Sequence, residues 1–466
     1  MNVIERVLMD TFDETLVPSS SNDTIHYLKP STFGYFKTYD GIKVNGDRVI
    51  AEIFKELEDL KLNKDTVINK ISIVGYSLGG LISRYIIGEL YEIGFFDSIE
   101  PINFTTFATP HLGVKFFKSR LLDRTLNFLG SHLLGYSGRD LFIYKSTILC
   151  DLANKDMKYY KGLEKFKLKI IVANIKYDRT VAFATSYITN YNPFEEWDSL
   201  NLKFIEDLPG VTIKGKKTAA NILDMEKTTR DSTIKTKFNV KEHSNKRGFI
   251  LSLIMVLFPF VFPIFLTATL FGSIKSTLRK AVIPNFDIQS SWNEIQKILK
   301  GEEDYSDEIY SSKSNELFNP IAAATQDIIE DTLNESEFHD NLESSPTPQL
   351  EKSENEELLD ESWRIKFNLD HAQAMIPKLL SRTKRLKTLS ELEITKDLVE
   401  LPYDEKRTEM CNNLNDLDWI KLPVFLKSLN AHEAIVSRRG LSRTTAGTPV
   451  IFLWASMLKK ELEKVN

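Results

Sequence analysis

A serine held between glycines at the junction of a strand and a helix restricts the fold of this chain more than any other feature. The stretch Lys70–Leu90 reads KISIVGYSLGGLISRYIIGEL, in which the short apolar run Ile71–Val74 is followed by apolar residues at helical spacing. Between them, GYSLG fits the pattern G-x-S-x-G. This pattern is typical of the nucleophile elbow, a strained strand-to-helix turn that lifts the serine hydroxyl above a sheet. The pattern predicts an α/β fold with Ser77 as a nucleophile. The alternative is that Ser77 only caps the helix.

Apolar runs alternate with helical periodicity over residues 1–215, which is typical of a mainly parallel sheet covered by helices. The predicted strands are Thr24–Leu28, Ile71–Val74, Ile102–Phe107 and Leu168–Ala173. The predicted helices are Asn45–Leu62 and Leu78–Ile93. Residues 113–163 are rich in Leu, Phe and Gly without strand alternation, so we expect a helical cap insertion over the strand ends.

Composition narrows the class of protein. With 466 residues, 42% of them hydrophobic, the chain can bury a large core. The formal net charge of -5 and the lack of Lys/Arg runs interleaved with aromatics argue against nucleic acid as a partner. Cys150 and Cys411, the only cysteines, have no metal-ligand spacing, so neither a disulfide framework nor a zinc site is expected. The N-terminus, MNVIERVLMDTFDETL, predicts an acidic amphipathic helix rather than a signal peptide.

An elbow serine needs a base and an acid, which follow it in the order Ser, Asp/Glu, His in this kind of fold. Asp178 comes shortly after the predicted strand Leu168–Ala173, the right place for the acid; it could instead simply pair with Arg179. Among the histidines, His432 falls in a loop between an apolar run and the C-terminal helical pattern, where the base belongs. The alternative for His432 is an ordinary loop histidine.

Two segments interrupt the core. Residues 248–272, GFILSLIMVLFPFVFPIFLTATLFG, carry no charge and have basic residues on both sides. About 20 apolar residues span a bilayer core, so this run predicts a membrane segment; a wholly buried helix is the alternative. Residues 301–361 are rich in Glu, Asp, Ser and Asn, which predicts a disordered linker. We expect the core to comprise residues 1–247 and residues 363–466.

The predicted site restricts the topology of the membrane segment. A single span through residues 248–272 would place Ser77 and His432 on opposite sides of the membrane. Pro259 and Pro263 near the middle of the run would break a straight helix, and the basic residues at both ends give no charge asymmetry. We therefore predict a hairpin that enters and leaves on one face.

Four blocks in this order, VGYSLGGLISRYIIG, FATPHLGVKFF, VANIKYDRTVAF and AHEAIV, resemble the fungal branch of the putative serine esterases, which contains a lipid-droplet phospholipase and related lipases. The resemblance covers the chain from about Thr32 to Arg438, apart from the linker. It implies an α/β-hydrolase fold, hydrolysis of glycerolipid esters, and Ser77, Asp178 and His432 as the catalytic triad. It also implies that His111, in ATPHLG, is structural or faces substrate rather than acting as the base.

The chain departs from that family at its start. Family members begin with a strand and a His-Gly loop that supplies an oxyanion donor, and this sequence contains no His-Gly pair. The Leu78 N–H is expected to donate one hydrogen bond to the oxyanion, and loss of the second donor typically costs about 10²–10³ in turnover. The missing strand would lie next to the elbow strand. We therefore expect an α/β-hydrolase fold that is incomplete at the N-terminus, from a misplaced start or an impaired relative.

Together these features predict a membrane-attached serine esterase or lipase that hydrolyses glycerolipids, with phospholipids as the expected substrates. It would sit on a lipid droplet or the endoplasmic reticulum, at the cytosolic face, and no metal or organic cofactor is implied. Two alternatives remain: a catalytically impaired, membrane-anchored interaction protein, and a soluble esterase of small esters. The sequence does not specify head group, acyl position, oligomeric state or protein partners.

Overall fold

The computed structural model describes residues 2–12, 24–32, 35–117, 120–213, 215–230, 286–301, 366–383, 389–428, 430–440 and 445–465, with residues 267, 269, 271, 272 and 274. The predicted membrane segment 248–272 lies outside the described residues apart from positions 267, 269, 271 and 272. The predicted linker 301–361 lies outside them apart from residue 301. Within the described residues, no helix combines the length and apolar character needed to cross a bilayer.

The centre of the molecule is a parallel sheet of four strands in the order β1-β2-β3-β9. The strands are β1 (Lys70–Tyr76), β2 (Glu100–Phe107), β3 (Leu168–Asn174) and β9 (Trp419–Val424). Because parallel neighbours need long crossovers, helices connect them and cover the sheet. This confirms the predicted α/β architecture, which is consistent with an α/β-hydrolase fold.

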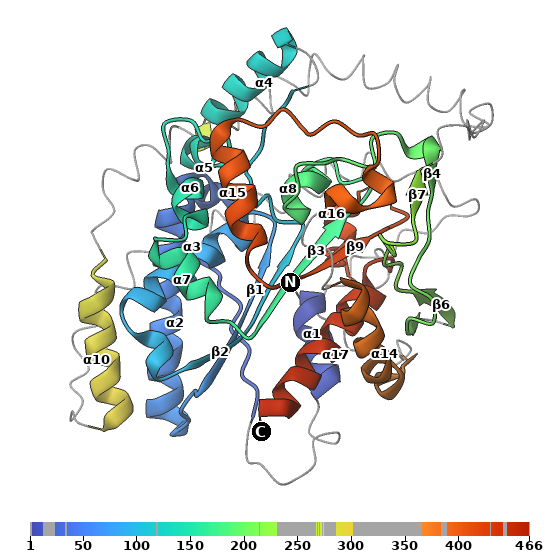
Figure 1. Cartoon of the computed structure of the whole chain (residues 1–466). Coiled ribbons are helices and arrows are strands. Elements are labelled where there is room, and N and C mark those ends of the chain that lie inside the picture. Colours follow the sequence, from blue (N-terminus) through green and yellow to red (C-terminus); the bar gives the residue numbers. More distant parts are fainter. Residues whose placement is uncertain are drawn as a thin grey trace, which may run out of the picture.

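Helices pack on both faces of the sheet (Figure 1). One face carries α2 (Ile42–Lys64), α3 (Leu78–Glu92), α7 (Lys158–Glu164) and α10 (Ile288–Lys300). The other face carries α1 (Asn2–Phe12), α14 (Leu369–Thr383) and α17 (Thr448–Val465). The alternation of side chains along β3 divides the core: Ile171 joins the first cluster, whereas Ile170 and Val172 join the second.

The elbow strand β1 forms one edge of this sheet within the described residues, and β9 forms the other. Every residue of β3 and β9 is buried, whereas Gly75 alone is buried in β1. The strands covered on both faces therefore carry the near-continuous apolar runs that a buried parallel sheet requires. Within the described residues, β2 is the only strand that pairs with β1.

Residues on both sides of the long undescribed stretches return to the same core. The strand β5 (Gly210–Ile213) pairs with β6 (Lys216–Ala219) and with β8 (Lys366–Phe367). Helix α10 starts at the Asp287 cap, ends at Gly301 in a left-handed conformation, and buries Trp292 against Phe54 of α2. A separate two-stranded ribbon joins β4 (Leu200–Asn201) and β7 (Thr229–Arg230).

The expected strand Thr24–Leu28 is wrong, because these residues adopt no regular structure. They run beside α2, where the His26 Nε2 lies 2.6 Å from the Glu56 carboxylate. The side chains of residues 24–26 are exposed, so this segment has no face that a sheet could bury.

The expected cap insertion is helical. It contains α4 (Arg120–Leu133), α5 (Gly135–Leu141) and α6 (Ile148–Ala153), besides α7. Helix α4 lies at the end of the molecule toward which the central strands run (Figure 1). Helix α7 lies on the face of the sheet beside α3, where Gly88 meets Tyr159, so this part does not cover the strand ends.

The remaining helical pieces are short. They are α8 (Phe183–Tyr187), α15 (Glu405–Asn415), α16 (Ala431–Ala434) and the short helical turns η2 (Tyr35–Asp40), η3 (Phe95–Asp97), η4 (Trp197–Ser199), η7 (Leu389–Glu391) and η8 (Glu393–Thr395).

Candidate active site

Ser77 occupies a strained turn between β1 and α3. Its φ of 53° and ψ of -129° lie in a region that residues with a side chain rarely adopt. The backbone holds it there: the Ser77 N–H donates to the Phe107 carbonyl at 2.9 Å, and its carbonyl accepts from the Gly80 N–H at 3.1 Å. Ser77 takes the N-cap position of α3, but its hydroxyl makes no capping hydrogen bond. The hydroxyl is therefore free for another partner.

Small residues let the turn close. A Cβ at Gly75 would lie 2.4 Å from the Gly80 Cα, and a Cβ at Gly80 would lie 2.1 Å from the Thr109 Oγ1. A Cβ at Gly79 would meet nothing within 4 Å. The steric requirement therefore falls on Gly75 and Gly80, although the motif that signals the turn names Gly75 and Gly79.

His432 lies beside the serine despite being 355 residues away in the chain. Its Nε2 is 3.0 Å from the Ser77 Oγ, within hydrogen-bond distance. The residue sits in the short helix α16, which follows β9 and begins at the cap residue Asn430. Because β9 runs parallel to β3, the segment that follows β9 places the ring at the carboxyl ends of the strands.

Asp178 contacts the other nitrogen of the ring. Its Oδ2 lies 2.9 Å from the His432 Nδ1, and its side chain is only 3% exposed. Its Oδ1 accepts hydrogen bonds from the N–H groups of Thr180 and Val181, at 2.9 and 2.7 Å. Within the described residues, the exposed Arg179 forms no ion pair with Asp178. The structure thus brings together all three residues that the sequence predicts as a triad.

Two further residues hold the base in place. Tyr76 donates its hydroxyl hydrogen to the His432 carbonyl at 3.0 Å, and its ring centroid lies 5.0 Å from that of His432. Burial raises the pKa of Tyr76, so its hydroxyl stays protonated as a donor. The Asn174 Nδ2 donates to the Asp178 Oδ2 at 3.2 Å and to the Ala431 carbonyl at 2.9 Å.

Sequence reasoning missed both Tyr76 and Asn174. Tyr76 directly precedes the nucleophile, and Asn174 is a polar residue at the end of the buried strand β3. A polar side chain at the carboxyl end of a central parallel strand was the available signal.

Leu78, predicted as an oxyanion donor, is the first residue of α3. The first N–H groups of a helix have no acceptor inside it, and the helix dipole favours negative charge at this end. The Leu78 N–H therefore has the position expected of one oxyanion donor, directly after Ser77.

His111 lies in the core and not in the site. Its ring is fully buried, with Nδ1 3.4 Å from the Arg84 Nη1 and Nε2 3.0 Å from the Thr106 Oγ1. Arg84 can only donate, so Nε2 carries the ring proton and donates to Thr106. Burial, reinforced by the positive charges of Arg84 and Lys421, lowers the pKa of His111 well below its usual value. Of its two predicted roles, the structural one matches this position.

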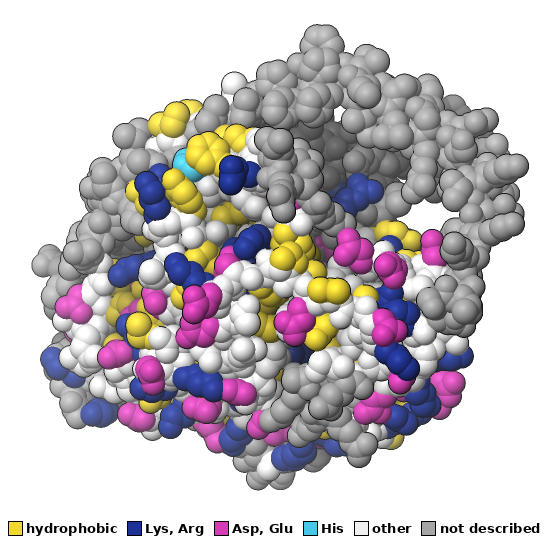
Figure 2. Space-filling model, turned by 45° about the horizontal axis from the view of Figure 1, so that its top comes forward, with side chains coloured by type: hydrophobic (Ala, Val, Ile, Leu, Met, Phe, Trp, Pro, Cys, Tyr) yellow, Lys and Arg dark blue, Asp and Glu magenta, His cyan; other side chains and the backbone are white. Residues whose placement is uncertain are grey.

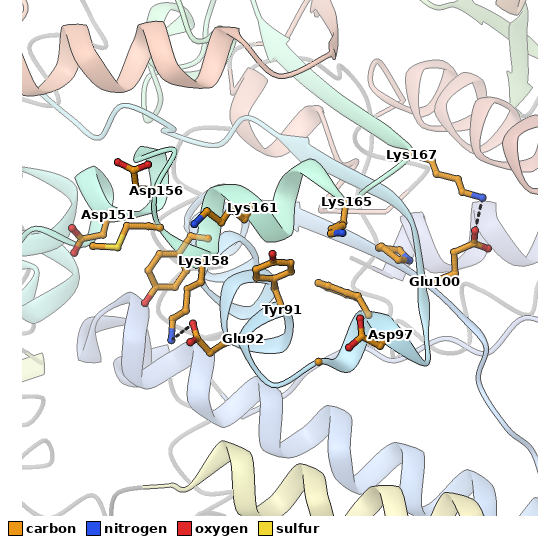
Figure 3. A pocket seen from close by; sticks show the side chains of 15 residues that line it. Tyr91, Glu92, Asp97, Glu100, Asp151, Asp156, Lys158, Lys161, Lys165 and Lys167 are labelled. Carbon is orange, nitrogen blue, oxygen red and sulfur yellow. Dashed lines mark ion pairs between the residues drawn. The ribbon is translucent and has the colours of Figure 1, made fainter.

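Figure 3 shows a hollow of about 930 Å³, and no residue of the triad lines it. It is lined by the end of α3, the start of β2 and α7, at the opposite end of the strands from Ser77. Two lysines of its wall pair with acids: Lys158 with Glu92 at 3.9 Å and Lys167 with Glu100 at 2.5 Å. Acidic and basic side chains alternate around the hollow, so it offers no field of one sign and no nucleophile.

The arrangement can perform nucleophilic acyl chemistry. A hydroxyl, an imidazole and a carboxylate form one hydrogen-bonded chain, and the hydroxyl sits beside a helix N-terminus that can stabilise a developing oxyanion.

Comparison with known proteins agrees with this chemistry. Residues 6–189 match the model of the protein family described as "Putative serine esterase (DUF676)". The chain is similar to "Putative lipase ROG1" of Saccharomyces cerevisiae, with 31% identity over 171 residues that cover 34% of this chain and 23% of that protein. It is also similar to "Putative lipase C4A8.10" of Schizosaccharomyces pombe, with 26% identity over 189 residues that cover 38% and 24% of the two chains.

The extent of these matches is limited. The matching region spans about a quarter of the length of these curated relatives. The family match includes Ser77 and Asp178 but ends before His432. No solved structure gives a significant match to the chain.

Proposed function

We propose that the chain is a serine hydrolase of glycerolipid esters, acting on phospholipids at a membrane or lipid-droplet surface, and the match of residues 6–189 to the putative serine esterase family supports the ester chemistry. The observation that carries the proposal is the hydrogen-bonded chain from Ser77 through His432 to Asp178, with contacts of 3.0 and 2.9 Å. The names of the similar yeast proteins support the ester class of substrate.

In the first half of the proposed reaction, the Ser77 Oγ attacks the acyl carbonyl carbon while the His432 Nε2 accepts the hydroxyl proton. Asp178 stabilises the resulting imidazolium through Nδ1. The carbonyl oxygen becomes an oxyanion that the Leu78 N–H can stabilise. Collapse of this intermediate breaks the ester C–O bond, and His432 returns the proton to the leaving alcohol.

In the second half, water replaces the alcohol. His432 takes a proton from the water, which attacks the acyl-serine carbonyl, and collapse releases the fatty acid and restores the Ser77 hydroxyl. Tyr76 and Asn174 hold the imidazole and the carboxylate in position throughout. Tyr76 binds the His432 carbonyl, and Asn174 binds both the Asp178 carboxylate and the Ala431 carbonyl.

The alternative is a catalytically impaired module retained for interaction. It is favoured by one observation, the lack of a His-Gly pair that would supply a second oxyanion donor. Loss of one donor lowers turnover by about 10²–10³ without removing it, so the two functions differ in rate rather than in site geometry.

The purified protein and its Ser77→Ala variant separate these functions. We expect the parent to release fatty acid from a short-chain ester and from phosphatidylcholine vesicles, and Ser77→Ala to lose at least about 10³-fold of this rate. Equal rates for the two proteins on both substrates would support the impaired module.

Attachment to a lipid surface is part of the proposal. Residues 230 and 286, on either side of the apolar run, both return to the hydrolase core: Arg230 donates to the Pro193 carbonyl, and α10 buries Trp292 against Phe54. This supports a run that leaves and re-enters on one side, as a hairpin in a monolayer of a lipid droplet or in the endoplasmic reticulum, with the core in the cytosol.

Glycosylation mapping tests this topology. Acceptor sites placed near the N-terminus and just beyond Lys280 should remain equally unmodified when the protein is made with endoplasmic reticulum membranes. Modification of one site alone would mean that the run crosses the membrane, and would remove His432 from the side that holds Ser77.

A further inference from the structure

Helix α4 (Arg120–Leu133) exposes large apolar side chains while it buries two of its polar ones. Phe128 is 56% exposed and Leu129 is 39% exposed, whereas Asp123 and Ser131 are buried. A helix that covers the core of a soluble protein has the opposite arrangement. The outward apolar face of α4 therefore has no partner within the described residues.

The exposed face extends beyond the helix. Leu126 on α4 and Phe116 in the preceding segment are 36% and 43% exposed. The Asn127 side chain fixes that segment against the helix: its Nδ2 donates to the Phe116 carbonyl, and its Oδ1 accepts from the Phe116 N–H. We call Phe116, Leu126, Phe128 and Leu129 the α4 patch.

Two exposed cations lie near the α4 patch, while Lys115 beside Phe116 is paired with Asp404. Arg124 on the helix and Lys145 beside it are exposed, and Lys145 lies 5.5 Å from the Tyr144 ring. That ring contacts His132, which in turn contacts Phe128. The only acid of α4 is Asp123, which is buried. Exposed apolar side chains bordered by cations fit the boundary between acyl chains and anionic head groups.

The α4 patch lies at the same end of the molecule as Ser77. Figure 1 shows α4 beyond the ends of the central strands, and Figure 2 shows hydrophobic side chains gathered there with a histidine and basic residues. A surface bound to this face would hold its lipids near the carboxyl ends of β1 and β2.

We propose that the α4 patch docks onto a lipid surface, inserting Phe128 and Leu129 among the acyl chains while Arg124 and Lys145 contact anionic head groups. The inference rests on the proposed hydrolysis of glycerolipids, and it adds a contact that presents the bilayer to Ser77. It is separate from the predicted membrane segment 248–272.

The first test reads contact with lipid independently of hydrolysis. Phe128→Trp and Val67→Trp are made in the intact Ser77→Ala chain. Val67 is a matched control because it is 55% exposed and precedes β1, at the end of the strand opposite to Ser77. The signal is the difference in fluorescence between Phe128→Trp and the Ser77→Ala chain without it. With vesicles of phosphatidylcholine and phosphatidylserine, we expect this signal to shift to the blue and to be quenched by brominated lipid. The control should show neither change.

The second test compares two substrates. Phe128→Ser combined with Leu129→Ser should lower hydrolysis of vesicle phospholipid by about tenfold or more and leave hydrolysis of a soluble short-chain ester within about twofold. Val67→Ser should change neither rate. Arg124→Gln should weaken binding only to vesicles that contain phosphatidylserine.

The outcomes separate the two proposals. If the parent hydrolyses neither substrate, the proposed function fails, while the fluorescence result still decides the lipid contact. Equal quenching of Phe128→Trp and Val67→Trp would overturn the docking proposal. A second result would also overturn it: the parent forms an oligomer, the Phe128→Ser and Leu129→Ser double variant does not, and both bind vesicles equally. The α4 patch would then face a second copy of the chain.

Discussion

Asn174 connects the acid and the base at the scale of single residues. One amide group donates both to the Asp178 carboxylate and to the carbonyl of Ala431, the residue before His432. The side chain is buried at the end of β3, so both loops are fixed relative to a rigid strand. Precise placement of such groups contributes to the rate because the imidazole must reach both Ser77 and Asp178 at once.

We expect Asn174→Ala to lower kcat by about tenfold with little change in KM, because two buried hydrogen bonds that orient the triad are lost. Asn174→Asp should be worse, since a second carboxylate would face Asp178 and the Ala431 carbonyl. Steady-state kinetics on a soluble ester measure both values. Asn412→Ala, which removes an exposed asparagine of α15, is the control. A loss confined to KM would contradict a positioning role.

The glycines of the elbow make a second residue-scale prediction. Gly80→Ala should lower the free energy of unfolding by about 1–3 kcal/mol or more, because its Cβ would overlap the Thr109 side chain. Gly79→Ala should leave stability unchanged or raise it by up to about 1 kcal/mol, since alanine favours the helix and meets open space. Thermal unfolding of the two variants checks this, and equal destabilisation would argue against the steric account.

Strand β9 shows how an element completes the site. It adds to the edge of β3 and carries α16, with His432, to the carboxyl ends of the strands. Its burial on both faces leaves even Lys421 only 4% exposed. The Lys421 ammonium donates to the Asn415 Oδ1 at 2.5 Å and the Ile188 carbonyl at 3.2 Å, without a carboxylate partner among the described residues.

Burial lowers the pKa of Lys421 to about 8 from its ordinary value of 10.5. The unfolded chain therefore binds this proton more tightly than the folded protein, and the folded state is penalised in full below pH 8. The penalty disappears as the pH rises to 10.5. Relative to Lys421→Met, the parent should gain up to about 3 kcal/mol of stability over this interval.

Denaturant unfolding of the parent and Lys421→Met between pH 7 and 10.5 measures this difference. Other groups titrate in both proteins, so the difference between them isolates the lysine. A difference that stays constant over the interval would mean that Lys421 keeps its ordinary pKa in the folded protein.

On the scale of the whole molecule, the core is assembled from segments that are distant in the chain. Helix α17 packs beside α1, and the Lys459 Nζ donates to the Thr11 carbonyl at 3.0 Å. The Trp454 indole donates to the Thr105 Oγ1 inside β2. Together with the β3–β9 pairing, these contacts join the C-terminal part to the N-terminal part without needing the connection between them.

A protease site inserted within residues 302–361 tests this. After cleavage, we expect the two fragments to remain together on gel filtration and to keep Ser77-dependent hydrolysis within about twofold, because the buried strand pair and helix contacts hold them. An uncleaved sample and a cleaved Ser77→Ala sample are the controls. Separation of the fragments under native conditions would show that the connection is needed.

The local elements and the candidate residues follow from short-range patterns in the chain. The strand and helix around Ser77 follow from hydrophobic periodicity and from glycines that only a tight turn requires, and both signals lie within a few residues. For the same reason α2, α3, β2 and β3 match their predicted positions closely. The predicted strand at Thr24–Leu28 was wrong because five residues of mixed polarity do not indicate whether a neighbouring strand will pair with them.

The contacts of these candidate residues depend on packing between distant parts of the chain. It placed His432 against Ser77 across 355 residues, moved His111 into the core, and recruited Asn174 and Tyr76 to the site. It also showed that the apolar side of α4 faces outward, although its periodicity is that of any amphipathic helix. Local periodicity fixes which side of an element is apolar, whereas long-range packing decides what that side meets, and no spacing within the sequence records it.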